Sequence, residues 1–329
     1  MAEMNLLEAV RSGLHEAMAR DQRVLVLGED VGKKGGVFGT TSGLFAAFGA
    51  ERVIDTPLAE SGIVGTAIGA AVNGLLPVVE IQFADFIFPA MNQIVSEAAR
   101  LRYRSNGEWG CPIVIRAPFG AGVHGALYHS QSVEAFFAHV PGLKVVVPST
   151  PADAKGLLAA AIADPDPVLF FEHKAAYRSV RGEVPDGDHR VPIGPARLAR
   201  AGRHLSVFTY GLMTHRVLEA AAAVEGDGID VEVVDLRTLR PLDRESILAS
   251  VRKTSKALIV SEDNLTGGIG GEVAALIAQE AFESLDGPVT RLGGPEIPAA
   301  PYAPPLEAAF LIDAARIAGA IRTLSLIHI

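Results

Sequence analysis

The sequence has little cysteine, no concentrated positive charge and no long apolar run. Its 329 residues include one cysteine, Cys111, which excludes an internal disulfide and fits a reducing compartment. The formal net charge is −9 without a Lys/Arg cluster, which speaks against nucleic acid or an anionic membrane as partner. No apolar run approaches the roughly 20 residues of a membrane span, and MAEMNLLEAV lacks the basic leader of a signal peptide. We expect a soluble, cytoplasmic protein.

Common enzyme signatures are also missing. No serine has a glycine two residues away on both sides, and no H-E-x-x-H occurs, which excludes the usual hydrolase and zinc-protease motifs. His124 and His129 have no Cys or third His to complete a zinc site. GAGVHG, residues 120–125, matches G-x-G-x-x-G, but no acidic residue follows about 20 positions later. We therefore read these glycines as a flexible loop and keep an NAD-binding oxidoreductase as a distant alternative.

What the sequence does contain is an alternation of short apolar runs with helical segments. The runs are nearly all apolar, as is typical of strands covered on both faces of a sheet. Pro89 and Pro151 stand where they can open helices between the runs. The alternation predicts an α/β fold with mostly parallel, helix-covered sheets. The predicted strands of the first half are RVLVLGED (23–30), VVEIQF (78–83), IVIRA (113–117), LKVVVPS (143–149) and VLFFEH (168–173).

A change of composition divides the chain. Residues 181–203 are rich in proline, glycine and charge, and are predicted to be a linker. We predict a first domain over residues 1–180 and a second over 204–324, where strands and helices alternate again and the last helix spans 305–324. Residues 325–329, SLIHI, match no pattern and are treated as a non-native tail.

One acidic residue stands out, because Glu60 begins a predicted helix whose other residues are small and apolar. The segment reads DTPLAESGIVGTAIGAA. An acid in the first turn favours the helix dipole by about 0.3–1 kcal/mol, which is the simplest explanation. A capping box would need the acid three residues after Thr56, where Ala59 stands. Apolar surroundings make an ionised carboxylate costly without a specific partner, so Glu60 is a candidate binding residue.

Five segments together resemble a known family. They are similar to the β subunit of the thiamine-dependent decarboxylase component of 2-oxoacid dehydrogenase complexes, in order and at the expected spacing from about residue 5 to residue 285. EIQFADFIFPA and GALYHSQSVEAFFAH most resemble the branched-chain (2-oxoisovalerate) member. The stretch EIPAAPYAPPLEAAF departs from the family's Pro-Thr-Pro-Tyr-like sequence. The five segments are LGEDVGKKGGVFGTT, DTPLAESGIVGTAIGAA, EIQFADFIFPAMNQIVSEAARLRYRS, GALYHSQSVEAFFAHVPGLKVV and VEVVDLRTLRPLD.

The resemblance implies a transketolase-like pyrimidine-binding domain, a transketolase C-terminal-like domain, and roles for individual residues. Glu60 matches the carboxylate that hydrogen-bonds N1′ of the thiamine aminopyrimidine and favours the imino tautomer that acts as base. An apolar wall strengthens that hydrogen bond by lowering the dielectric. Leu58, Gln82 and Phe86 match positions that line the pyrimidine, with Phe86 stacked on the ring. His129 matches an active-site histidine that steadies intermediates and helps the acyl group pass to lipoamide.

Other implied residues shape the site or hold a cation. Glu29, with Asp30, matches a segment that shapes the site and the subunit contact. Some family members also hold a potassium ion on backbone oxygens. The matching positions here are Ile113, Ala161, Asp164 and Asp166.

The motif that binds magnesium and diphosphate in thiamine enzymes is not recognisable here. Gly226-Asp227-Gly228 is not followed, after a helix-sized gap, by asparagine, and is predicted to be a turn between a helix and a strand. The resemblance implies that an α subunit supplies this motif and its Mg²⁺, with the active site at the α–β boundary of an α2β2 heterotetramer. The chain would then be inactive alone.

The implied reaction is the oxidative decarboxylation of a branched-chain 2-oxoacid on thiamine diphosphate. The acyl group then passes, by reductive acylation, to the lipoyl group of the acyltransferase partner. The second domain would help to assemble the tetramer and to dock this partner. Pyruvate and acetoin dehydrogenase β subunits are the near alternatives. A non-catalytic subunit that only stabilises an α partner is a further one.

Overall fold

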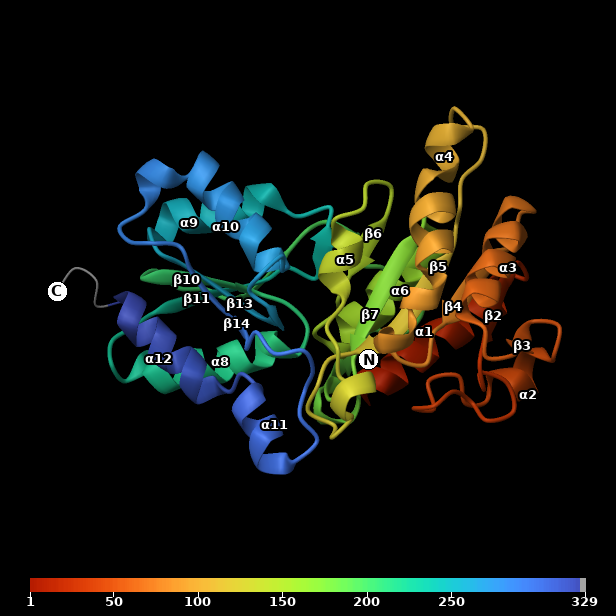
Figure 1. The fold of residues 1–329 in the computed structure, drawn as a ribbon, viewed down its shortest axis with the longest axis horizontal. Coiled ribbons are helices and arrows are strands. Elements are labelled where there is room, and N and C mark those ends of the chain that lie inside the picture. The colour runs from red at the N-terminus through yellow and green to blue at the C-terminus, as the bar shows by residue number, and fades with distance from the viewer. Residues whose placement is uncertain (326–329) are drawn as a thin grey trace. The chain divides into compact units, whose positions relative to one another are not determined.

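The chain folds into two α/β units (Figure 1). The computed structural model describes residues 1–325, so residues 326–329 of the predicted tail lie outside the described part. The first unit comprises residues 1–119 and 136–193, and the second comprises residues 120–135 and the described residues from 194 onward. Each unit has a mostly parallel sheet between helices, which confirms the predicted fold class.

The predicted strands of the first half form the parallel sheet of the first unit. Its strands follow one another in the order β6-β7-β5-β4-β2-β3, and every neighbouring pair among them is parallel. The longer strands β2, β5 and β7 are buried along their whole length, as their apolar sequences predict. The bounds are β2 (Val24–Gly28), β3 (Val53–Asp55), β4 (Leu76–Glu80), β5 (Val114–Phe119), β6 (Lys144–Val146) and β7 (Val168–His173).

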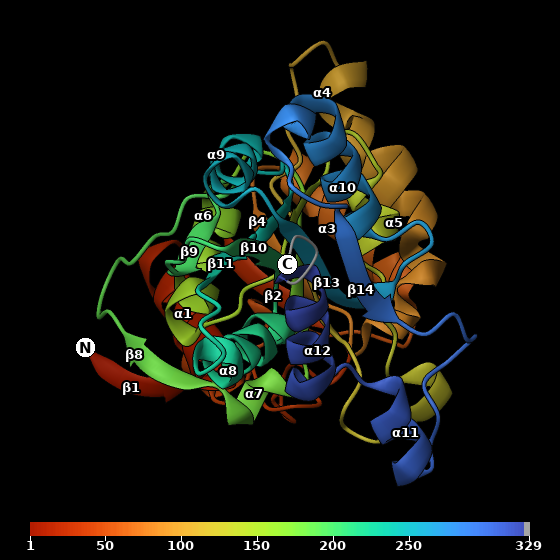
Figure 2. The same cartoon turned by 90° about the vertical axis from the view of Figure 1, so that its left-hand side faces the viewer.

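Helices cover both faces of this sheet. Figure 2 shows α1 and α6 on one side of β2 and β4, and α3 on the other. An Asn5/Glu8 capping box starts α1, with both hydrogen bonds at 2.8 Å. Pro151 opens α6 as predicted, and Thr150 caps it by accepting the amide of Asp153. The bounds are α1 (Leu6–Arg20), α2 (Leu44–Phe48), α3 (Glu60–Val72), α6 (Pro151–Ala163) and α7 (Ala176–Ser179).

The helix predicted after Pro89 is irregular. Pro89 does stand in the first turn of a short 3-10 segment, but a π-helical turn and another 3-10 turn follow before α4. Residues 84–104 therefore change helix type several times instead of forming one regular helix. The segments are η1 (Ala84–Phe86), η2 (Phe88–Ala90), η3 (Gln93–Glu97), η4 (Ala98–Arg100) and α4 (Leu101–Arg104), and α5 (Glu134–Ala138) comes later.

The second unit repeats this plan with a five-stranded sheet in the order β14-β13-β10-β11-β9. The strands are parallel except for the edge strand β9, which runs antiparallel to β11. Helices α9 and α10 lie on one face, and α8 and α12 on the other (Figure 1). The bounds are β9 (Arg197–Arg200), β10 (Leu205–Thr209), β11 (Val231–Asp235), β13 (Ala257–Asn264), β14 (Thr290–Gly294), α8 (Leu212–Glu225), α9 (Arg244–Thr254), α10 (Ile269–Glu280) and α12 (Ala314–Ser325), with the short elements β12 (Thr238–Arg240) and η6 (Phe282–Ser284).

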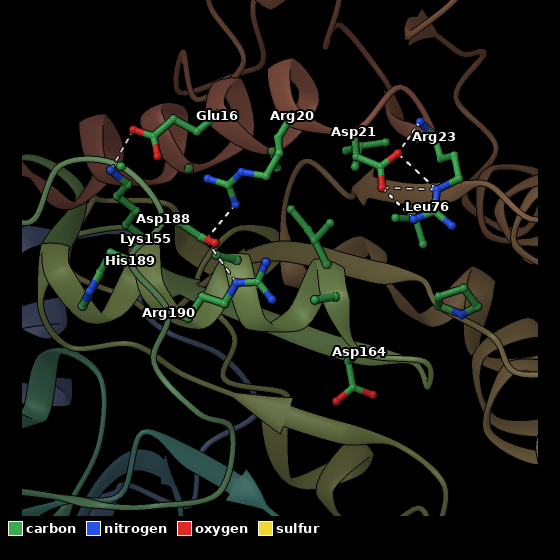
Figure 3. Close-up of a pocket in the computed structure, with 18 of the residues that line it drawn as sticks. Glu16, Arg20, Asp21, Arg23, Leu76, Lys155, Asp164, Asp188, His189 and Arg190 are labelled. Carbon is green, nitrogen blue, oxygen red and sulfur yellow. Dashed lines mark hydrogen bonds and ion pairs between the residues drawn. The ribbon is translucent and has the colours of Figure 1, made fainter.

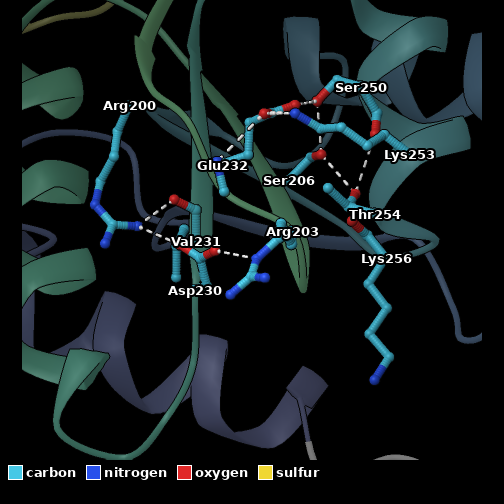
Figure 4. A network of polar contacts seen from close by, with 11 residues as sticks. Arg200, Arg203, Ser206, Asp230, Val231, Glu232, Ser250, Lys253, Thr254 and Lys256 are labelled. Carbon is cyan, nitrogen blue, oxygen red and sulfur yellow. Dashed lines mark hydrogen bonds and ion pairs between the residues drawn. The ribbon is translucent and has the colours of Figure 1, made fainter.

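A chain of polar contacts ties the sheet of the second unit to α9 (Figure 4). The Ser206 hydroxyl lies 2.6 Å from both the Ser250 and Thr254 hydroxyls. Ser250 donates in turn to the Glu232 carboxylate at 2.6 Å, and Lys253 pairs with the same carboxylate. Glu232 is buried, so these partners are what makes its charge tolerable in the interior.

Two local predictions differ from the structure. The helix predicted over residues 305–324 is divided into α11 (Pro304–Phe310) and α12. The cause is the extended backbone of Leu311 (φ −67°, ψ 146°), after which Asp313 starts a new helix by accepting the amide of Arg316 at 2.8 Å. Residues 181–203 also contain two strands, β8 (Arg181–Val184), which pairs with β1 (Ala2–Asn5), and β9. Among residues 1–325, no helix has the length and apolar composition needed to cross a bilayer.

Candidate active site

Glu60 is the first residue of α3, as predicted. The residue before it, Ala59, is the N-cap and offers no side-chain oxygen to cap the helix. Glu60 is the acidic residue of the first turn. Ser61 donates to the carbonyl of Pro89 at 2.9 Å, which holds the start of α3 against the η2 segment. Ile63 and Val64 are buried behind it. Glu60 is half-buried, so its carboxylate combines a positive helix end with an apolar support.

A second carboxylate, Glu29, shares the surroundings of Glu60. Glu29 follows β2 at the carboxyl edge of the parallel sheet, where ligands of α/β proteins usually bind. Burial raises the pKa of Glu29, and the charges of Glu60 and Asp30 raise it further. The amide of Gln82, which follows β4, donates to Asp30 at 3.2 Å. The structure therefore brings together the regions of Glu29, Glu60 and Gln82, which lie at least about 20 positions apart in the sequence.

Aromatic rings stand beside these polar groups. Phe86 packs edge-to-face on Phe83 with 5.8 Å between ring centres, and Phe38 packs on Phe83 in the same way at 5.4 Å. Phe86 is half-buried, so part of its ring stays accessible. Leu58, two residues before Glu60, exposes 78% of its surface. Partly accessible apolar side chains that neighbour Gln82 and Glu60 along the chain suit a planar heterocyclic ring with polar edges.

A buried charge cluster, which sequence reasoning missed, lies under the loop that carries Glu29. Arg116 on β5 bonds both oxygens of Glu172 on β7 (2.6 and 2.7 Å) and one oxygen of Glu80 on β4 (2.7 Å). The hydroxyl of Thr40 donates to Glu80 at 2.9 Å and so connects the 29–41 loop to the cluster. The sequence feature that could have revealed this cluster is one charged residue in each of three largely apolar strands, namely Glu80, Arg116 and Glu172.

His129 lies in a loop that groups with the second unit, residues 120–135. It follows the 3-10 turn η5 (Ala126–Tyr128) and is half-buried. The glycines at 120–125 therefore lead into a single tight turn, without the helix that a dinucleotide fingerprint needs for its pyrophosphate. Glu29, Glu60, Gln82 and Phe86 belong to the first unit, so the predicted residues are divided between the two.

The end of the His129 loop carries an acid that resists ionisation. Glu134 is fully buried and accepts the phenol of Tyr210 at 2.8 Å. Burial raises the pKa of Glu134 to about 8, with a further contribution from the charge of Asp263. Burial likewise raises the pKa of Asp263 to about 6, with an added contribution from Glu262. Acidic groups are thus concentrated where water is excluded.

Glu134→Gln is expected to stabilise the protein at alkaline pH. The folded-state pKa of about 8 lies above the ordinary 4.5, so the stability contributed by the proton is complete below 4.5 and is lost as the pH rises through 8. Glutamine keeps an acceptor for Tyr210 and never ionises. The unfolding free energy of the variant relative to wild type should rise by about 2 kcal/mol between pH 6 and pH 9. Denaturant unfolding at both pH values measures this difference, with the exposed Glu245→Gln as control. An unfolding free energy that changes with pH equally in Glu134→Gln and wild type would disprove the prediction.

Of the four residues predicted to bind potassium, Asp164 and Asp166 are charged, and both carboxylates are already engaged by cations of the chain. The carboxylate of Asp164 holds the ammonium of Lys144 at 2.6 Å from each oxygen, and Asp166 holds Arg102 at 2.5 Å. The carbonyl of Ile113 accepts the amide of Val168, and that of Ala161 accepts the amide of Asp164. Within residues 1–325 no group of three or more His, Cys, Asp or Glu side chains is placed to hold a metal. A cation here would have to use backbone oxygens.

A cavity of about 430 Å³ opens elsewhere in the first unit (Figure 3). Val24 and Leu76 line it, so it lies where β2 and β4 begin, at the edge opposite to Glu29. Its charges are paired, with Arg20 and Arg190 both reaching Asp188 in Figure 3 at 2.7 and 3.1 Å. Because ligands of parallel α/β sheets bind at the carboxyl ends of strands, the Glu29–Glu60 region is the better candidate.

The Gly226-Asp227-Gly228 turn lies between α8 and β11, as predicted. Gly228 has a φ of +77°, which glycine adopts easily. The carboxylate of Asp227 is paired with Arg322 at 2.7 Å on the surface. In this structure the Asp227 carboxylate is therefore engaged by a cation of the chain itself.

Comparison with known proteins places these observations in a family context. Residues 2–180 match the family "Transketolase, pyrimidine binding domain", and residues 194–317 match "Transketolase, C-terminal domain". The chain is 58% identical to 2-oxoisovalerate dehydrogenase subunit beta of Bacillus subtilis (strain 168), over 99% of each chain. It is 50% identical to the pyruvate dehydrogenase E1 component subunit beta of the same organism, over 90% of this chain and 91% of that one.

A solved structure is similar over nearly the whole length. It is described as a split gene transketolase, inactive beta4 tetramer, and is 25% identical to this chain. The TM-score is 0.80, and the match covers 98% of this chain and 99% of that one. The transketolase-type fold is therefore common to both chains.

Proposed function

Because the chain belongs to the β-subunit family of the 2-oxoacid dehydrogenases, with transketolase-type pyrimidine-binding and C-terminal domains, we propose that it serves a branched-chain 2-oxoacid dehydrogenase. The enzyme would decarboxylate the 2-oxoacid on thiamine diphosphate and reductively acylate the lipoyl group of its acyltransferase. The full-length identity of 58% to the 2-oxoisovalerate relative, against 50% to the pyruvate relative, carries the choice of substrate class.

The site residues fit a thiamine pyrimidine. Thiamine diphosphate, when bound, supplies the nucleophilic carbon and the electron sink of the reaction. Glu60 would accept the hydrogen bond of the pyrimidine N1′, and Glu29 would adjust the electrostatic environment of Glu60. Gln82 would hydrogen-bond the ring edge, while Phe86 and Leu58 would cover its faces. The half-buried carboxylate beside an aromatic wall and the raised pKa of Glu29 support this assignment.

We propose that the chain needs an α subunit, in an α2β2 heterotetramer, to be active. The α subunit would supply the diphosphate and Mg²⁺ site. The pairing of Asp227 with Arg322 supports this, since the Gly-Asp-Gly turn of this chain is occupied by a surface ion pair. His129 would assist transfer of the acyl group to the lipoyl partner, and the second domain would help to dock that partner.

Potassium is a finer part of the proposal. The ion would bind backbone oxygens of Ile113, Ala161, Asp164 and Asp166, because Lys144 and Arg102 already neutralise the two carboxylates. Equal melting temperatures in potassium and sodium chloride would remove this ion from the proposal.

The domain division and the cellular location are proposals as well. We propose a pyrimidine-binding domain over 1–180, a connecting segment over 181–203 and a C-terminal domain over 204–324. The family match at 2–180 supports the first domain, and the match at 194–317 supports a second domain that begins within the proposed connecting segment. The single cysteine supports a reducing, cytoplasmic location, which cell fractionation would test.

Co-expression with the α subunit tests the function. The purified complex should decarboxylate 3-methyl-2-oxobutanoate with a kcat/KM at least about tenfold above that for pyruvate, since a pocket shaped for a branched side chain gains about 1–3 kcal/mol from it. A preference for pyruvate or acetoin would reject the branched-chain choice and leave the family intact. Turnover by the chain without α would contradict the shared site. Binding of NAD to this chain in calorimetry would favour the oxidoreductase alternative.

A further inference from the structure

The loop that carries His129 has a backbone that cannot satisfy its own amides. The amide of Gly120 donates to the carbonyl of Gln131 at 3.0 Å and closes the loop at its base. Between these ends, Gly122, His124 and Ala126 all have positive φ values, of 84°, 56° and 53°. Residues 120–125 belong to no helix or strand, so amides of this stretch that the loop itself does not satisfy need other acceptors.

Two buried glutamates of the same unit supply those acceptors. Glu262, at the end of β13, accepts the amide of Ala121 at 2.6 Å. Glu307, in α11, accepts the amides of Gly122 and His124 at 3.2 and 3.1 Å through one oxygen. Its other oxygen contacts the imidazole Nδ1 of His124.

Both glutamates are buried, so their hydrogen bonds with the loop help to stabilise their charges. Glu307 exposes only 2% of its surface and Glu262 only 7%. A carboxylate so buried is costly without hydrogen bonds, so the contacts of Glu307 with the loop amides favour the present conformation of the loop. The imidazole of His124 is largely exposed, whereas the carboxylate it contacts is not. Glu307 therefore fixes the loop from the protein side.

The fixed half of the loop touches His129 directly. A Cβ placed on Gly125 would lie 2.6 Å from the carbonyl oxygen of His129 and 2.9 Å from its Cβ. The backbone next to His124 is thus packed against the backbone of His129, with no room for a side chain between them. Gly125 thus connects the anchored residues 122–124 to His129 by direct packing.

We propose that Glu307 is a positioning residue for His129: by accepting the amides of Gly122 and His124 it holds the loop in the conformation that sets the imidazole of His129. Glu262 holds the loop one residue earlier. The inference rests on the proposed role of His129 in acyl transfer to the lipoyl group. It assigns a function to the C-terminal stretch that departs from the family sequence.

Hydrogen exchange tests the anchoring independently of catalysis. In the α–β complex, Glu307→Ala should raise amide exchange across residues 120–131 by about tenfold or more, because the acceptor of two loop amides is lost. Glu307→Gln should preserve most of the protection, since its amide oxygen can still accept both hydrogen bonds. Glu296→Gln is the matched control, because Glu296 also accepts a backbone amide, that of Thr266 at 2.9 Å, but in another loop.

The activity readout separates positioning of His129 from general damage. With Glu307→Ala, transfer to the isolated lipoyl domain should fall by about tenfold or more, and decarboxylation measured with an artificial electron acceptor by less than about threefold. Unchanged exchange in Glu307→Ala would overturn the anchoring. Increased exchange with an equal loss in both reactions would overturn the positioning of His129. A wild-type complex without decarboxylase activity would reject the proposed function, while the exchange result would still decide the anchoring.

Discussion

Glu60→Gln should lower kcat for decarboxylation by about 10²–10⁴-fold in the α–β complex, the range expected when a group that sets proton transfer is lost. The carboxylate at the start of α3 is proposed to accept a hydrogen bond from the pyrimidine N1′ and so to favour the imino tautomer that acts as base. An amide of the same size neither carries the charge nor favours that form. The variant should fold normally, because the helix loses only the dipole interaction, about 0.3–1 kcal/mol.

The control for this variant is Glu51→Gln. Glu51 is an exposed glutamate of the same unit, and its replacement tests the loss of one negative charge without touching the site. Sedimentation of both complexes should show the same assembly with α. Glu60→Gln with more than half of wild-type turnover would remove the catalytic assignment. Intact turnover together with intact assembly would instead favour a subunit that only stabilises its partner.

Helix and strand positions could be predicted where local pattern determines structure. The run RVLVLGED contains β2, and Pro151 with Thr150 starts α6, because apolar runs and capping residues act within a few positions. The start of α3 at Glu60 was predicted for the same reason. The break between α11 and α12 was not, since the pattern of Leu311, Ile312 and Asp313 is compatible with a continuous helix.

The candidate site was predictable only in part. Glu29 and Gln82 follow neighbouring parallel strands, and such strand ends meet at one edge of a sheet, so their proximity follows from topology. The roles of Glu60 and His129 came from family resemblance. The partnership of Glu307 with the His124 amide spans 183 residues, and no local pattern encodes which distant carboxylate a loop amide will meet.

Arg116→Met should destabilise the protein by about 3–5 kcal/mol, the usual result of removing one partner from a buried ion pair. Arg116 exposes 0% of its surface and pairs with both Glu80 and Glu172. Burial opposes its charge, but the carboxylates of Glu172 and Glu80 outweigh that effect and raise its pKa. Without it, two buried acids would face each other unpaired. Total stabilities are about 5–15 kcal/mol, so the yield of folded protein should also fall.

Arg23→Met is the matched control for burial. Arg23 pairs with Asp21 at 2.7 Å, the same distance as Arg116 to Glu80, but 62% of the Arg23 side chain is exposed. A surface pair of this kind contributes about 0–1 kcal/mol, so the melting temperature of Arg23→Met should be close to that of wild type. Thermal unfolding of the two variants in the α–β complex gives the comparison. Equal melting temperatures for both would show that the Arg116 cluster contributes no more than a surface pair.

A triple variant identifies the cause of the stability loss that we expect for Arg116→Met. Adding Glu80→Gln and Glu172→Gln to Arg116→Met removes the unpaired charges, while both amide oxygens can still accept the hydroxyls of Thr40 and Tyr177. Replacing a whole buried ion cluster by neutral groups is often nearly neutral for stability, so the triple variant should regain most of the lost melting temperature. If it stays as unstable as Arg116→Met, the loss comes from packing around the guanidinium. The cluster would then act on the 29–41 loop through its shape and not through its charge.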